Sequence, residues 1–97
     1  MSDGEIKVIL SPHAMRRCAE RGIAKEDIEK VCRNPIQTVF DSDRKNFKSV
    51  GKIEDKYYPA DTYLVVIHTK EVDRVIHIIS AMYTSQGGLP RFGFSNL

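Results

Sequence analysis

A histidine and two arginines follow one another at intervals of four residues near the start of the chain: His13, Arg17 and Arg21. On an α-helix, side chains spaced by four residues lie in a row on one face. Two guanidinium groups can hold a phosphate through paired hydrogen bonds, and a neutral imidazole can take up a proton. The row therefore predicts an anion site that can also move protons. The alternative is that Glu20 and acids of the following segment pair with these cations on an ordinary solvated helix surface.

A second group of candidates lies in the apolar segment 74–83, which is typical of a β-strand. Strict alternation would place His77 on one face of this strand together with Ile79, Ala81 and Tyr83. Tyr83 stands at the end of the segment, where it could line the edge of a site. A lone histidine in such a strand is commonly a hydrogen-bonded core residue, and this interpretation stays open beside the functional one.

Metal and cofactor chemistry finds little support in the sequence. The three histidines, His13, His68 and His77, lie far apart, and the paired Cys and His motifs typical of zinc sites are missing. The glycine-rich loops that bind nucleotide phosphates are also missing. We therefore expect neither a metal ion nor a cofactor.

Length and composition are those of one small globular domain. The chain has 97 residues, of which 41% are hydrophobic and 29% charged, and a net charge of +2 neither demands nor excludes a nucleic-acid partner. No apolar run approaches the ~18 residues of a membrane span, and the first residues are polar and acidic, unlike a secretory signal. Cys18 and Cys32 are expected to be reduced and buried, so we expect a cytoplasmic protein that does not enter membranes.

Local signals predict two helices in the first third of the chain. Ser11 followed by Pro12 is a typical helix start, because serine caps the first turn and proline fits its first position. The first predicted helix runs to about Arg21 and is ended by Gly22. A second predicted helix covers about 24–33 and stops ahead of a proline, which drives the residue before it out of helical conformation.

From residue 36 onward the apolar pattern takes the period of two that is typical of β-strands. Strands are predicted at 36–41, 47–53, 61–69 and 74–83, with 61–69 central and Gly51 a weak point or bulge. Residues 5–10 predict a short strand or an extended arm, and 85–97 an irregular tail rich in glycine and phenylalanine. The predicted fold is α+β, with two N-terminal helices packed on a four-stranded antiparallel β-meander.

The segment 11–23 resembles the opening of a bacterial and archaeal family, domain of unknown function 4258. Its members resemble the pattern HAxxRxxxRGI, followed by an acidic helix, an Asn-Pro pair and a β-meander that ends in Ile-Ile-Thr/Ser-x-Tyr. The resemblance covers roughly residues 11–84. The matching pieces here are Arg21-Gly22-Ile23, Asp27-Ile28, Asn34-Pro35 and Ile78-Ile79-Ser80-Ala81-Met82-Tyr83.

The family is thought to be similar to the BrnT and RelE toxins, so the resemblance implies a small metal-independent endoribonuclease of the toxin type. In that interpretation His13 is the base, Arg17 and Arg21 hold the phosphate, and His77 or Tyr83 supplies the acid. RNA and a cognate antitoxin protein are the partners that the resemblance implies. The residues that the family motif itself carries over are His13, Arg17 and Arg21.

One departure from the toxin pattern supports an alternative. The stretch 75–82 resembles the BrnT strand that ends in RIISAR, but His77 and Met82 stand where that pattern carries arginines. The alternative is a non-catalytic interaction module, binding nucleic acid or protein, on a degenerate toxin-like fold. The two interpretations differ on whether His13, Arg17 and Arg21 converge with His77 or Tyr83.

Overall fold

The first helix begins and ends where its local signals predict. In the computed structural model, which describes residues 5–54 and 57–95, helix α1 spans Pro12–Glu20. The side chain of Ser11 accepts a hydrogen bond from the backbone N–H of Ala14 at 3.1 Å, and Pro12 occupies the first turn. After the helix, Gly22 adopts a left-handed conformation with φ of 69°, which glycine takes without a steric penalty.

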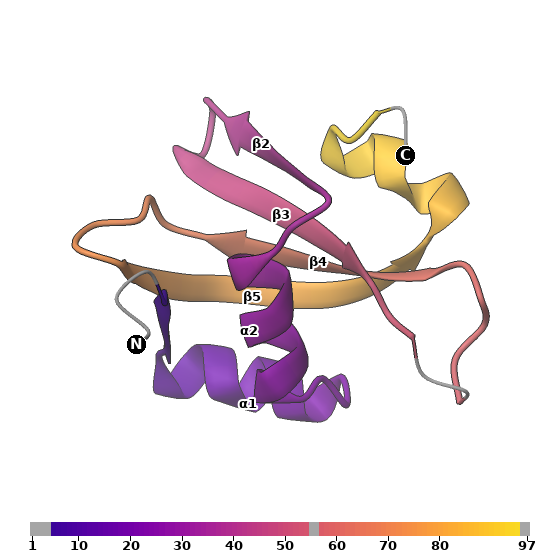
Figure 1. The fold of residues 1–97 in the computed structure, drawn as a ribbon, viewed down its shortest axis with the longest axis horizontal. Helices are drawn as coiled ribbons and strands as arrows, with labels where there is room; N and C mark the ends of the chain where they lie inside the picture. Colours follow the sequence, from indigo (N-terminus) through magenta and orange to yellow (C-terminus); the bar gives the residue numbers. More distant parts are fainter. Residues whose placement is uncertain (1–4, 55–56, 96–97) are drawn as a thin grey trace.

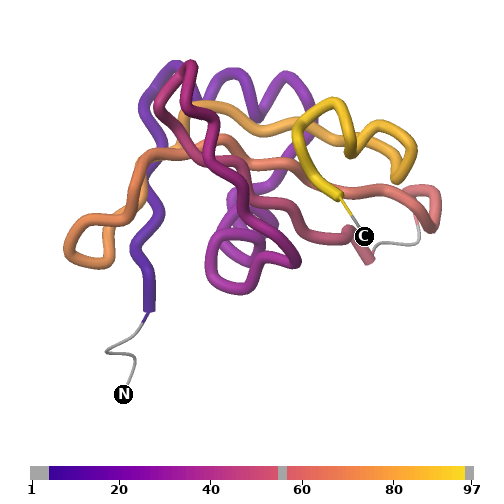
Figure 2. The backbone as a smooth tube through the Cα atoms, turned by 90° about the horizontal axis from the view of Figure 1, so that it is seen from above, coloured from indigo at the N-terminus to yellow at the C-terminus, as the bar shows by residue number. Residues whose placement is uncertain are grey.

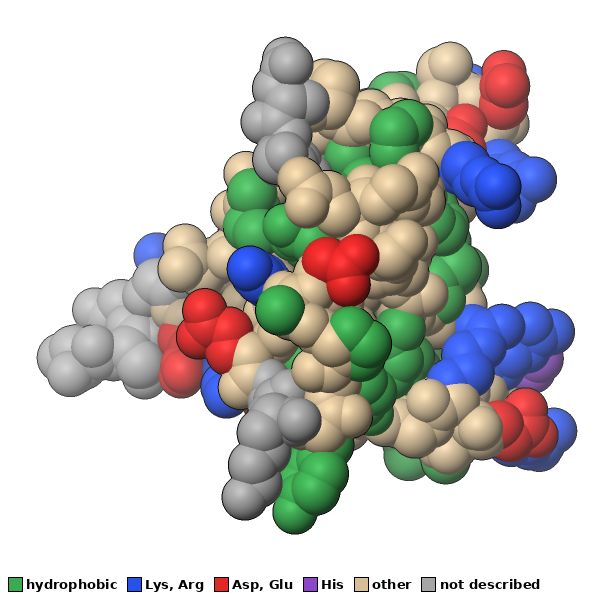
Figure 3. All heavy atoms as spheres, turned by 90° about the vertical axis from the view of Figure 1, so that its right-hand side faces the viewer, with side chains coloured by type: hydrophobic (Ala, Val, Ile, Leu, Met, Phe, Trp, Pro, Cys, Tyr) green, Lys and Arg blue, Asp and Glu red, His purple; other side chains and the backbone are tan. Residues whose placement is uncertain are grey.

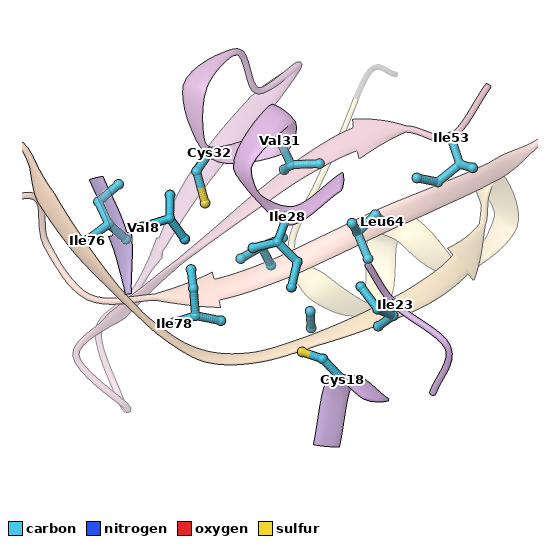
Figure 4. Packing of buried hydrophobic residues seen from close by; sticks show 12 residues of the cluster. Val8, Cys18, Ile23, Ile28, Val31, Cys32, Ile53, Leu64, Ile76 and Ile78 are labelled. Carbon is cyan, nitrogen blue, oxygen red and sulfur yellow. The ribbon is translucent and has the colours of Figure 1, made fainter. Parts of the chain in front are cut away.

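Helix α2 spans Lys25–Arg33 and carries acids in its first turn, where the helix dipole stabilises negative charge. It ends at Asn34, the residue before Pro35, as predicted. Its buried side chains are Ile28, Val31 and Cys32, all on one face. Figure 4 shows Ile28 and Val31 pointing from α2 toward the sheet.

The sheet has five strands in the order β1-β5-β4-β3-β2 (Figure 1). The short strand predicted within residues 5–10 is present at 7–10. It corrects the predicted four-stranded antiparallel sheet, because it joins the sheet as a fifth strand and pairs with β5 in parallel. A local turn signal could not predict this pairing, because both helices and the other three strands lie between β1 and β5 in the sequence. The strands are β1 Lys7–Leu10, β2 Gln37–Asp41, β3 Asn46–Lys52, β4 Thr62–His68 and β5 Val75–Ser85.

A β-bulge in β5 corrects the predicted faces of its side chains. The register between β4 and β5 shifts at Ile67/His68, so that His68 pairs with Ile78 and Ile67 pairs with Ser80. The extra residue reverses the alternation. Tyr83 consequently packs on the helix-covered face. His77 points to the opposite face of the sheet, because its neighbours Ile76 and Ile78 are core residues of the helix-covered face. The prediction that His77 and Tyr83 share a face was wrong. It assumed strict alternation of side chains along the strand, and alternation does not hold across an inserted residue.

The main core lies between the two helices and the sheet. Strand β4 is central, as predicted, and its Leu64 and Val66 are fully buried against α2. Figure 4 shows Ile28 between Leu64 and Ile78. Cys18 and Cys32 are buried free thiols in this core, also as predicted, and burial raises the pKa of Cys32 to about 11.

The C-terminal tail, predicted to be irregular, forms a 3₁₀ segment, Gln86–Phe92, that covers part of the opposite face of the sheet. Leu89 and Phe94 are buried there in a second apolar cluster with Val50, Tyr63 and Val65. In the view of Figure 2, β1 and this segment lie on either side of α2. No helix within the described residues has the length and apolar character to cross a membrane.

Gly51 lies within the regular ladder between β3 and β4, opposite Leu64, so the predicted bulge is not at this position. Its role is to let α2 approach the sheet. A Cβ atom at residue 51 would lie 2.8 Å from Cγ2 of Val31, closer than two carbon atoms can pack. The short, β-branched valine cannot rotate away easily.

We expect Gly51→Ala to lower the free energy of unfolding by about 1–3 kcal/mol, because the added methyl group overpacks the contact with Val31. Urea denaturation followed by circular dichroism measures this loss. Gly87→Ala is the matched control, since its nearest neighbouring atom would lie 3.9 Å away. Combining Gly51→Ala with Val31→Ala should cost less than the sum of the two single changes. Additive losses would show that the close approach is not the reason for the glycine.

Candidate functional site

Of the predicted row, His13 and Arg17 lie on helix α1 and Arg21 is its C-cap residue, and all three residues are exposed. Acidic pairing, the alternative interpretation of the row, is not found among the described residues. The acids that do form ion pairs with Lys25 and Arg33 are Glu5 and Glu29. Within residues 5–54 and 57–95, neither the imidazole of His13 nor the guanidinium of Arg17 forms a hydrogen bond or an ion pair. Figure 3 shows Lys and Arg side chains gathered in two groups along one side of the molecule, with a histidine beside the lower group.

Arg21 is the member of the row that is fixed in place. Its Nη1 donates hydrogen bonds to Oγ of Ser80 at 3.0 Å and to the carbonyl oxygen of Ala81 at 2.8 Å. Both acceptors lie on β5, so the arginine ties the end of α1 to the last strand of the sheet. Its guanidinium keeps donors beyond these two, since an arginine carries five N–H groups.

Tyr83 reaches the same end of α1 from β5. Its hydroxyl donates to the carbonyl oxygen of Gly22 at 3.4 Å, and its ring packs against Tyr58 at a centroid distance of 4.9 Å. Arg21 and Tyr83 therefore meet where α1 turns toward α2. His13 stands at the other end of the helix, about 12 Å away along its axis.

His77 is separated from that meeting point. Its side chain is exposed, so the alternative of a buried core histidine does not hold. Its backbone N–H donates to Oγ1 of Thr69 at 3.1 Å, which fixes the strand rather than the imidazole. The structure thus brings Arg21 and Tyr83 together and leaves His77 on the other face of the sheet.

A chain of hydrogen bonds that the sequence did not reveal runs through the helix-covered face. Oγ1 of Thr38 lies 2.9 Å from Oγ of Ser49, and Oγ of Ser49 lies 2.8 Å from Nε2 of His68. Nδ1 of His68 lies 2.8 Å from the carbonyl oxygen of Thr69. Ser49 and His68 are buried, whereas Thr38 is exposed. The available signal was Ser49, a polar residue on the same face of its strand as Phe47 and Gly51.

The direction of these hydrogen bonds follows from their acceptors. A carbonyl oxygen only accepts, so Nδ1 of His68 carries the proton and Nε2 of the neutral ring accepts from the Ser49 hydroxyl. Ser49 in turn accepts from Thr38. Burial lowers the pKa of His68, while its hydrogen bond to Thr69 opposes that shift. The chain therefore ends in a neutral imidazole near pH 7.

A cleft of about 270 Å³ opens beside this chain. Its lining includes Pro35 at the end of α2, Phe47 and Ser49 of β3, and His68 of β4. None of His13, Arg17, Arg21, His77 and Tyr83 lines it. Within the described residues, no group of three or more His, Cys, Asp or Glu side chains is placed to hold a metal ion.

His68 should make stability depend on pH in a predictable direction. Because its folded-state pKa is lowered, the unfolded chain binds a proton first as the pH falls below about 6.5, and protonation favours unfolding. We expect the free energy of unfolding to fall from pH 7 toward pH 5, and His68→Gln to remove part of this slope. Urea titrations at several pH values measure it, with the exposed His77→Gln as the control. Equal slopes for the wild type and His68→Gln would contradict the prediction.

The comparisons with known proteins point to one family. Residues 10–87 match the family described as Domain of unknown function (DUF4258). Neither the curated proteins nor the solved structures contain a significant match to the chain. Since the match spans most of the chain, including both helices and all of strands β2 to β5, this protein belongs to the DUF4258 family.

Proposed function

We propose that the protein is a small metal-independent endoribonuclease. The observation that carries the proposal is the exposed row formed by His13 and Arg17 on α1 and by Arg21 at its C-cap, where no described acid forms an ion pair with it. Uncompensated cations at successive turns of a helix repel one another, so the row does not stabilise the helix by itself. A phosphate bound between two neighbouring members of the row would supply missing negative charge.

Cleavage of RNA without a metal requires three functions at one phosphate. A base takes the proton of the 2′-hydroxyl, cations stabilise the charge of the pentacovalent phosphorane, and an acid protonates the leaving 5′-oxygen. In this proposal His13 is the base, and Arg17 and Arg21 hold the phosphate. Tyr83 is the preferred acid over His77, because its hydroxyl lies at the Arg21 end of α1. His13 lies about 12 Å from that end along the helix axis, so the proposal requires RNA binding to bring base and acid to the same phosphate.

A relation to the BrnT and RelE toxins is part of this proposal. A ribonuclease of that kind harms its own host unless it is held inactive, so the proposal includes a cognate antitoxin protein as a partner. His77 and Met82 stand where the BrnT pattern carries arginines, and the cationic role would therefore rest on helix α1 rather than on β5.

A binding module without cleavage is the second candidate. It is favoured by Arg21, whose guanidinium is already hydrogen-bonded to Ser80 and Ala81. An arginine used to fix the fold has fewer donors left for a transition state. The same row would then hold the phosphates of a nucleic acid without reaction.

Incubation with a mixed-sequence RNA in EDTA tests the proposal. We expect the wild type to cleave, His13→Ala to lose about 10²- to 10⁴-fold in rate as a general base is removed, and Arg17→Ala to lose about 10²- to 10³-fold as a charge-stabilising donor is removed. Gel electrophoresis of end-labelled RNA measures the rates. Products that end in a 2′,3′-cyclic phosphate would identify attack by the 2′-hydroxyl.

Arg16→Ala is the matched control, because Arg16 is an exposed arginine of the same helix outside the row. Its rate should stay close to that of the wild type. A well-folded wild type that cleaves none of several RNAs would reject the nuclease and leave the binding module. Cleavage that is indifferent to His13→Ala would reject the assignment of the base.

A further inference from the structure

Three rings form a ladder across neighbouring strands on the helix-covered side of the sheet. Phe40 of β2 pairs with Phe47 of β3, and Phe47 pairs with His68 of β4. The two phenylalanine rings have centroids 4.9 Å apart, and the Phe47 and His68 rings are stacked within 12° of parallel at 6.0 Å. The ladder runs from the buried imidazole to Phe40, which is 55% exposed at the edge of the sheet. An aromatic ring left open to solvent on a fixed support is a stacking surface.

Hydrogen-bonding groups lie beside this ladder. Thr38 is two residues from Phe40 on the same strand, so both side chains face the same side. Its hydroxyl is the exposed end of the chain that leads through Ser49 to His68, which holds it in a defined direction. Glu71 lines the cleft together with Thr38 and Phe47, and its carboxylate adds an acceptor.

The turn at the end of the ladder carries positive charge. Residues 42–45 connect β2 to β3, and Arg44 and Lys45 are exposed there. The neighbouring acid, Asp41, is held by Lys48 at 3.3 Å and by the backbone N–H groups of Asp43 and Arg44. Its charge is therefore compensated by Lys48. Asp43, also exposed in the turn, carries one negative charge, so Arg44 and Lys45 leave the turn with a net charge of +1.

We propose that one base of a single-stranded RNA stacks on the exposed ring of Phe40 and directs its hydrogen-bonding edge to Thr38 and Glu71, which line the neighbouring cleft. Proteins that bind single-stranded RNA combine aromatic stacking surfaces, polar groups at the base edge and nearby cations for the backbone. All three are present here within two adjacent strands and their turn. The inference rests on the proposed function for the choice of RNA, but it concerns recognition of a base and not cleavage.

The volume and lining of the cleft agree with a planar ligand. The cleft has a volume of about 270 Å³ and is lined by Phe47 but not by Phe40, so it receives the edge of the base while Phe40 stacks on its face. Its walls are largely apolar, with a few polar groups that fix orientation, as in other small-molecule sites. Glu71 can accept from a donor on the base edge, either an exocyclic amino group or the N3–H of uracil, so its carboxylate orients the base.

Binding of a fluorescein-labelled 2′-O-methyl RNA octamer separates this inference from catalysis, because such an RNA has no free 2′-hydroxyl and cannot be cleaved. Fluorescence anisotropy should show Phe40→Leu weakening the binding by about 5- to 100-fold, the range expected for one base–aromatic stack. Phe40→Tyr keeps the ring and should keep the affinity. Ile36→Ala is the matched control, since Ile36 is 52% exposed and lies outside the ladder.

The possible outcomes are distinct. If the wild type binds the octamer through Phe40 but cleaves no RNA, the proposed function fails and the base site stands. If RNA is cleaved while Phe40→Leu changes neither octamer affinity nor the KM for RNA, the base site is rejected and the nuclease stands. Loss of binding equally severe in Ile36→Ala, or a wild type that self-associates through Phe40 and binds no octamer, would also overturn the inference.

Discussion

Helix α2 lies against the neighbouring strands β3 and β4 at van der Waals distance, and the placement of the other elements depends on this contact. The approach is close because β3 presents Gly51 to Val31, while β4 offers Leu64 and Val66 to Ile28. Burying these side chains contributes roughly 1.5–3 kcal/mol each. With α2 fixed over β3 and β4, the short connection through Ile23 leaves α1 over β5 at the side of the sheet. The cationic row of α1 is displayed there because the other face of the helix is buried.

Strand β5 contacts the end of α1 that carries Arg21, and it also holds His77 and Tyr83, the two candidate acids. Its outer end accepts the hydrogen bonds of Arg21 and carries Tyr83, and its bulge turns His77 to the opposite face. A bulge of one residue thus decides which of two candidate acids lies near the row. Bulges recur beside functional sites because they redirect a side chain without breaking the sheet.

The chain from Thr38 through Ser49 to His68 shows how the sheet tolerates polar groups in its interior. A buried hydroxyl or imidazole without a partner would cost about 1–3 kcal/mol. Each group in this chain has one, and the last donates to a backbone carbonyl. The hydrogen bonds fix the orientation of His68, against which Phe47 stacks, and so hold the aromatic ladder in register. The exposed ring of Phe40 depends on this interior arrangement.

Signals between near neighbours allowed the sequence to determine the helices, most of the strands and the alignment of the row. Ser11 and Pro12 set the start of α1, Gly22 its end, and Pro35 the end of α2, since each acts through its own backbone within one turn. The spacing of four that aligns His13, Arg17 and Arg21 is likewise a property of any helix.

Only the tertiary structure decided the features that join distant segments. They are the parallel pairing of β1 with β5, the bulge that separates His77 from Tyr83, the contacts of Arg21 with β5, and the ladder from Phe40 to His68. Each depends on the register between strands or on the packing of a helix against them. The physical reason is that register is set by the burial of whole faces, to which many residues contribute at once, so no local pattern in the chain specifies it.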